Sequence, residues 1–213
     1  RRLILKADSI YRQTGARASR GNVFNSLAEA ELAMGHLDSA RAYIAEGAGL
    51  AEALGSSQIA FFVSNNQGEL ALREGDAPTA LRHFERARQL ASENDLVATE
   101  ITTLTSIGRS RLALGKPRAA LTATRRATEM HRAHDLAALD GMSPPLTWWR
   151  HSQALQANKK TQAAREALEM AYQFLQKGIA GLSDEGLRRN YLNKIEAHRE
   201  IVHAWLKDAR KRR

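Results

Sequence analysis

Cysteine is absent from this chain of 213 residues, and proline occurs only four times. Without cysteine the chain can form no disulfide, no thiolate metal site and no cysteine nucleophile, and its composition fits a reducing compartment. Aromatic residues make up only 6% of the chain. Alanine, leucine, arginine and glutamate are abundant instead, which indicates a helical protein.

Long apolar runs are also missing from the sequence. No segment approaches the roughly 18 apolar residues that a membrane span needs, and the opening residues Arg1-Arg2-Leu3 lack the layout of a signal peptide. We therefore expect a cytoplasmic protein with no membrane span. Because the chain starts without methionine, we also expect it to be a piece of a longer protein.

The excess of positive charge is concentrated near the C-terminus. The net charge is +9, and the segment from Arg188 to Arg213 holds nine Lys/Arg against three Asp/Glu, or +6 of that excess. A basic tail can bind phosphate groups or an acidic membrane surface. The alternative is a solvated helix end or a linker, which is the more common case.

A pattern recurs every forty residues through much of the chain. Its clearest columns hold glycine (Gly35, Gly75, Gly115) and, five residues later, alanine (Ala40, Ala80, Ala120). Internal repetition with a period of about 20 to 50 residues is typical of a solenoid or a repeat array. The repeats therefore predict the fold more directly than the composition does.

Each repeat has the apolar spacing of two helices joined by a short turn. We predict one repeat domain over residues 1–213. Its parts are the second helix of a truncated repeat (1–20), hairpins at 21–58, 59–95, 96–137 and 144–181, and a capping helix at 183–210. In the first hairpin the helices should run from Asn22 to Met34 and from Leu37 to Leu54, with Gly35 as a left-handed C-cap.

Three further details follow from the repeat pattern. Small residues at Ala28, Gly68 and Gly108 predict a close crossing of the two helices in each hairpin. An insertion before the fourth hairpin places Ser143 as the cap of a helix that Pro144 begins. The final helix should start at Ser183 or Asp184 and continue unbroken, with these apolar positions: Tyr191, Leu192, Ile195, Ile201, Val202 and Trp205.

These residues resemble the tetratricopeptide repeat family. Its pattern has a small residue in the first helix, glycine at the turn, and then alanine, a large residue and alanine; this sequence has Gly68, Gly75, Ala80, Phe84 and Ala87. The long period is similar to the extended repeats of kinesin light chains, of scaffolds that bind G-protein subunits, and of bacterial regulators. The segment 181–206 is similar to the end of such arrays in large bacterial regulators. The resemblance implies an all-α fold, a right-handed superhelical array of antiparallel hairpins.

The resemblance also implies a protein-binding function. In this family the first helices line a concave groove that holds an extended peptide or a partner helix. We expect an interaction module or scaffold within a larger bacterial signalling or transcription-regulating protein. The candidate partner-binding residues are Asn25, Glu29, Phe62, Asn65, Asn66, Glu69, Arg73, Thr105, Arg109, Trp149 and Arg150.

The chemistry of these side chains suits a polypeptide ligand. Asparagine supplies both a donor and acceptors for a peptide backbone, and arginine can form a fork with a carboxylate. The alternative is that these side chains are simply solvated. If they bind a partner, replacing Asn65 and Asn66 together by alanine should weaken binding and leave the melting temperature nearly unchanged.

Catalytic chemistry has no evident place in the sequence. His131 and His134 lie three residues apart, but no third metal ligand follows at a useful spacing, and surface histidines explain them better. No phosphate loop, nucleophile elbow or zinc-protease motif is present. We expect no enzyme activity, no cofactor and no metal.

Two other functions remain open. The basic tail could serve a regulator that contacts nucleic acid. A first helix with exposed Leu3, Ile4 and Ile10 could form a homodimer.

Overall fold

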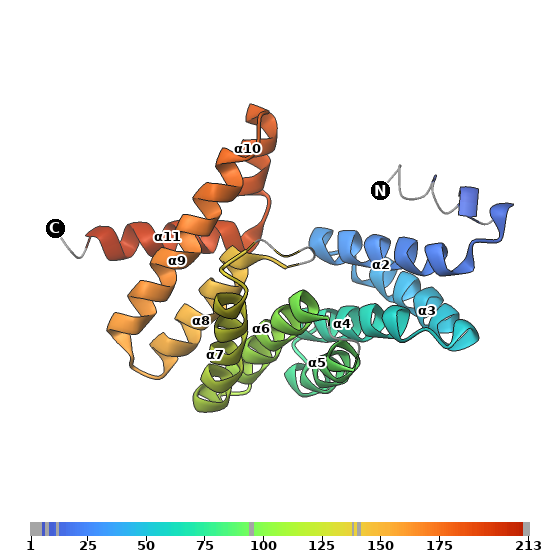
Figure 1. Cartoon of the computed structure of the whole chain (residues 1–213), viewed down its shortest axis with the longest axis horizontal. Coiled ribbons are helices and arrows are strands. Elements are labelled where there is room, and N and C mark those ends of the chain that lie inside the picture. Colours follow the sequence, from blue (N-terminus) through green and yellow to red (C-terminus); the bar gives the residue numbers. More distant parts are fainter. Residues whose placement is uncertain are drawn as a thin grey trace. The chain divides into compact units, whose positions relative to one another are not determined.

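The computed structural model describes residues 6, 9–11, 13–93, 96–137, 139 and 142–210. Regular structure in these residues is entirely helical, which confirms the predicted all-α helical-repeat fold. The chain divides into two compact units, Arg1–Leu96 and Val97–Arg213. We describe each unit by itself (Figure 1).

Two helical hairpins form the first unit. Helix α2 (Arg17–Met34) pairs with α3 (Leu37–Leu54), and α4 (Ser57–Arg73) pairs with α5 (Ala77–Ser92). Helix α4 also packs against α2 and α3, so the second hairpin stacks on the first. This stacking buries the apolar face of each hairpin, which is how a repeat array builds its core.

Of the two predicted ends of α2, after Gly21 and before Gly35, only the end before Gly35 is confirmed. Gly35 ends α2 with φ of 80°, the left-handed conformation expected of a glycine C-cap. The start of α2 was predicted at Asn22, but the helix begins five residues earlier. Gly21 lies inside the helix because it packs against Ile59, whose Cδ1 would be only 2.5 Å from a Cβ at that position. This glycine permits close packing and does not mark a helix boundary.

The second unit contains two further hairpins followed by two more helices. Its helices are α6 (Val97–Ala113), α7 (Pro117–Ala133), α8 (Pro144–Ala157), α9 (Thr161–Ala180), α10 (Glu185–Asn193) and α11 (Glu196–Arg210). Helix α6 pairs with α7, α8 pairs with α9, and α11 packs across α9 and α8 (Figure 1). Pro144 begins α8 as predicted, but the Ser143 side chain makes no capping hydrogen bond.

The predicted unbroken capping helix is wrong, because α10 and α11 are separate helices. Asp184 caps α10 as expected, accepting a hydrogen bond from the Leu187 N–H at 2.8 Å. At the break, His198 Nδ1 donates to the Tyr191 carbonyl at 2.7 Å, and Arg199 donates to the Asn193 carbonyl. These side chains replace the helical bonds that the last carbonyls of α10 lose. Ile195, predicted to be a buried helix position, is 43% exposed at this junction.

Some sequence predictions fall outside the described residues. Leu3 and Ile4 of the proposed dimer helix are among them, as are Lys211, Arg212 and Arg213 of the tail. Ile10 is described and is 49% exposed. None of the described helices is long and apolar enough to cross a bilayer.

Candidate functional site

The predicted partner-binding residues lie on the first helix of each hairpin. In the first unit they are Asn25 and Glu29 on α2, and Phe62, Asn65, Asn66, Glu69 and Arg73 on α4. In the second unit they are Thr105 and Arg109 on α6, and Trp149 and Arg150 on α8. The candidate site therefore consists of one set of residues in each unit.

Two of the asparagines bind each other. Asn66 Nδ2 donates to Asn25 Oδ1 at 2.7 Å, and Asn25 Nδ2 donates to Glu29 Oε1 at 3.2 Å. Asn66 is only 3% exposed. Burial raises the pKa of the Glu29 carboxyl, and the hydrogen bond from Asn25 acts in the opposite direction. This chain of hydrogen bonds joins α2 to α4, so Asn66 connects consecutive hairpins.

Asn65 and Phe62 lie on the same helix as Asn66 but are less buried than it is. Both side chains are half-buried, and Asn65 Oδ1 has no hydrogen-bond partner within the described part of the chain. The Phe62 ring meets the Phe61 ring edge-on, with the centroids 5.2 Å apart. This oxygen is itself buried, so a ligand could reach only the exposed parts of the Asn65 and Phe62 side chains.

In the second unit the candidate residues contact other helices. Thr105 is buried; its hydroxyl donates to the Ile101 carbonyl at 2.8 Å and lies 3.4 Å from the hydroxyl of Thr147 on α8. Trp149 Nε1 and Arg150 Nη1 both donate to one oxygen of Glu200 on α11, at 2.7 and 3.3 Å. The polar groups of Trp149 and Arg150 therefore hold α11 in place.

A cleft of about 540 Å³ lies beside Trp149, between α8, α9 and α11. We call it the α8–α11 cleft. Its apolar wall includes Leu168 and Ala204, and its polar wall includes Gln153, Gln156 and Lys207. The ion pair between Arg165 Nε and Asp208 Oδ1, at 2.9 Å, joins α9 to α11 along the cleft. An apolar wall with a few amides and charged side chains is the usual lining of a ligand site.

Sequence reasoning missed most of this cleft. Trp149 could be identified from the sequence because it occupies an inward-facing position on the first helix of its hairpin. Lys207 and Ala204 reach the cleft only because the chain breaks between α10 and α11, and no sequence signal marks that break. The apolar spacing of α11 was visible in the sequence, but the helices against which it packs could not be predicted from that spacing.

The histidine prediction was also wrong in part, because His131 is fully buried. Its Nδ1 accepts a hydrogen bond from Trp148 Nε1 at 3.0 Å, so its Nε2 carries the proton and donates to the Ala137 carbonyl at 3.0 Å. Both ring nitrogens are occupied by these two bonds. No group of three or more potential metal ligands occurs among the residues that the structure describes.

Stacked helical hairpins with short turns define a helical-repeat protein. Residues 60–133, which span most of α4 through α7, match the family model described as tetratricopeptide repeat. The comparison with curated proteins finds no match. The match supports the resemblance to tetratricopeptide repeats over this segment, and repeats of that family generally act as protein–protein interaction modules.

Proposed function

We propose that this chain is a non-catalytic module that binds an extended segment of a partner protein, with the α8–α11 cleft as the main contact site. The observation that carries this proposal is the lining of the cleft: an apolar wall, two glutamines and a lysine in a chain of interaction repeats. The resemblance of segment 181–206 to bacterial regulators supports a place in a larger cytoplasmic signalling or regulatory protein.

The cleft side chains have the chemistry that a peptide needs. Gln153 and Gln156 can each donate to a backbone carbonyl and accept from a backbone N–H, whatever the peptide sequence. Leu168 and Ala204 offer apolar contact to a side chain, and Lys207 favours an acidic residue nearby. In the first unit, Asn65 and Phe62 provide a smaller surface of the same kind.

The test is a selection from a displayed library of linear peptides, followed by calorimetry with the selected peptides. Gln156 and Lys207 are exposed, so replacing both with alanine should remove ligand contacts without disturbing the core. We expect this cleft variant to weaken the selected peptides at least tenfold, which corresponds to about 1.4 kcal/mol.

The matched control replaces Gln176 and Lys177 with alanine. Both are exposed on α9, in the same unit, and neither lines the α8–α11 cleft. Their loss should leave peptide affinity unchanged. If the cleft variant binds every selected peptide as tightly as the unchanged chain does, the cleft is not the contact site.

A further inference from the structure

The positive charge of this protein belongs to the second unit. Residues 97–213 contain 21 Lys/Arg and 11 Asp/Glu, a net charge of +10, whereas residues 1–96 contain 11 and 12, a net charge of −1. Even without the tail, residues 97–187 hold twelve Lys/Arg against eight Asp/Glu. The excess therefore extends into the hairpins of the second unit.

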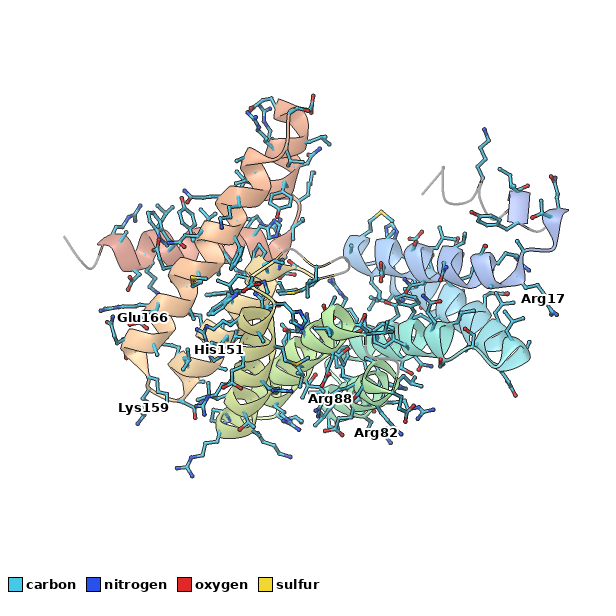
Figure 2. All side chains as sticks on the ribbon, in the orientation of Figure 1. Arg17, Arg82, Arg88, His151, Lys159 and Glu166 are labelled. Carbon is cyan, nitrogen blue, oxygen red and sulfur yellow. The ribbon has the colours of Figure 1, made fainter. Side chains whose placement is uncertain are left out.

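Four cations of these hairpins meet at one place. Lys116 and Arg118 flank Pro117 at the start of α7, and Asn158 Nδ2 donates to the Pro117 carbonyl at 2.7 Å. Lys159 and Lys160 follow Asn158 directly, in the turn between α8 and α9. All four cations are exposed, and Figure 2 shows Lys159 projecting from its turn. We call these four residues the basic turn surface.

Within the part of the second unit that the structure describes, no acidic side chain pairs with this surface. The four side chains make no hydrogen bond or ion pair with any residue that the structure describes, and neither α7 nor α9 has an acidic residue in its first turn. The α4–α5 turn in the first unit is different. There Asp76 caps α5 by accepting from the Thr79 N–H at 3.0 Å, and Glu74 pairs with Arg41.

Lys159 also stands where folding alone favours glycine. Its φ is 59°, in the left-handed region, and the turns of the other hairpins have Gly35, Gly75 and Gly115 in that conformation. A side chain with a Cβ is disfavoured there. The stability of the turn therefore does not explain a lysine at this position. We take its charge as the reason for the residue.

The composition of the surface identifies the kind of partner. Apart from the cations, its exposed or half-buried side chains include the polar residues Asn158, Thr161 and Gln162 and one apolar residue, Pro117. Protein interfaces have apolar and aromatic cores from which lysine is depleted, and single-stranded nucleic acid needs aromatic rings for stacking. Lysine, arginine, threonine and amide side chains are the groups that contact phosphates of a duplex.

We propose that the basic turn surface binds the phosphate backbone of double-stranded nucleic acid, independently of base sequence. This activity is separate from peptide binding in the α8–α11 cleft, and it does not depend on the C-terminal tail. The affinity comes from displaced counterions, so it falls steeply as salt rises.

The experiment measures fluorescence anisotropy of a short labelled DNA duplex between about 50 and 200 mM salt. A turn variant of the full chain carries Lys116→Asp, Arg118→Gln, Lys159→Gly and Lys160→Asp. Aspartate at an N-cap and glycine at a left-handed position both favour the fold. The melting temperature of this variant should therefore equal or exceed that of the unchanged chain.

A control variant changes the net charge by the same amount in the first unit. It carries Arg17→Gln, Arg82→Glu, Arg86→Gln and Arg88→Glu, all at exposed positions. Figure 2 labels Arg17, Arg82 and Arg88. We expect the turn variant to lose at least tenfold in duplex affinity, with the slope of log K against log salt reduced by about 3 to 4 for four phosphate contacts. The control variant should bind like the unchanged chain.

Several results would overturn the proposal. One is a lack of duplex binding by the unchanged chain at the lowest salt, and another is an equal loss of affinity in both variants. Tighter binding to phosphatidylserine vesicles or to polyglutamate than to the duplex would assign the surface to a membrane or to an acidic protein. Binding that survives in the turn variant but disappears when residues 207–213 are removed would assign it to the tail.

Discussion

Asn65 and Asn66 show how much a single position on a helix decides. The two residues are neighbours of the same type, and sequence reasoning gave both a role in partner binding. One residue step turns a helix by about 100°, which is enough to bury Asn66 against Asn25 on α2 and to leave Asn65 half-exposed. Sequence alone could not separate them, because the distinction depends on which helix packs alongside.

The two asparagines should therefore respond differently to replacement by alanine. Asn66→Ala leaves Asn25 Oδ1 without its donor, so we expect the free energy of unfolding to fall by about 1 to 3 kcal/mol. Asn65→Ala removes no hydrogen bond that the structure shows at Oδ1, so stability should change little. The double variant is therefore a poor test of binding, contrary to the expectation from sequence. Urea denaturation followed by circular dichroism checks both values, and equal stability losses would contradict this assignment.

A second residue-scale feature is the group of buried histidines in the second unit. Burial lowers the pKa of His151 to about 4, and the nearby positive charges of Arg132 and Arg125 act in the same direction. Burial also lowers the pKa of His131 and of His198. Thr124 Oγ1 lies 3.0 Å from His151 Nδ1 in a hydrogen bond. The fold therefore contains these three rings in their neutral form.

This arrangement predicts a loss of stability in acid. A histidine whose folded pKa lies below its unfolded value binds protons more tightly when unfolded, so its contribution is complete above about pH 6.5 and is lost as pH falls toward 4. His151 alone should account for roughly 3 kcal/mol of this loss. All three tryptophans, Trp148, Trp149 and Trp205, lie in residues 97–213, so their fluorescence during urea unfolding reports on this unit.

The control for this pH effect is His151→Gln, whose amide can still bond to Thr124 but does not titrate. Its stability should fall less between pH 6.5 and 4 than that of the unchanged chain. Parallel pH curves for His151→Gln and the unchanged chain would contradict a neutral buried ring.

Among the elements, the crossing of the two helices in a hairpin was the feature best predicted from sequence. Gly68 on α4 lies against Phe84 on α5, where a Cβ would come within 2.7 Å of the Phe84 ring. At Gly108 on α6, a Cβ would overlap the Cγ2 methyl of Thr124 on α7. A glycine opposite a larger side chain is visible in the sequence once the repeats are aligned, because the same column recurs.

Gly108→Ala should test this close crossing. Overpacking of this kind costs about 1 to 3 kcal/mol, and the gain in helix propensity from alanine, about 1 kcal/mol, offsets part of it. Adding Thr124→Ser removes the obstructing methyl and keeps the hydroxyl that bonds to His151. The double variant should regain the stability that Gly108→Ala loses, as measured by urea unfolding. Failure of this rescue would show that the cost does not arise from the methyl.

The end of the second unit marks the limit of prediction at this scale. Apolar residues continue at helical spacing from Tyr191 to Trp205, so the sequence pattern indicates one helix. The break depends on His198 and Arg199, whose side chains reach the carbonyls of α10. Trp205 is held against α9 by stacking on Tyr172, with ring centroids 4.2 Å apart, and by its hydrogen bond to Glu169. These contacts exist only in the folded protein, and periodicity carries no sign of them.

For the whole molecule, the repeat pattern predicted the fold class, but it did not predict the division into two units or the distribution of charge between them. The aligned columns contain the positions that the repeats share. The two units differ in charge at the positions that vary from one repeat to the next. The turn between α4 and α5 contains Glu74 and Asp76, and the turn between α6 and α7 contains Lys116. Such substitutions leave the helices unchanged and, together with the basic segment 188–213, they leave one unit with a charge of −1 and the other with +10.

The charge of the second unit makes a final prediction about salt. Like charges repel one another in the compact state, and this unit has a net charge of +10 even though it contains ion pairs such as Arg150 with Glu200 and Arg165 with Asp208. Raising salt from about 0.01 to 0.1 M shortens the Debye length from about 30 to about 10 Å. Repulsion acts over longer distances than the contact ion pairs do, so screening should weaken it more. We therefore expect the urea midpoint, followed by tryptophan fluorescence, to rise with salt, and to rise less in the turn variant, whose net charge is lower by six. A midpoint that falls over this range would mean that the ion pairs outweigh the repulsion.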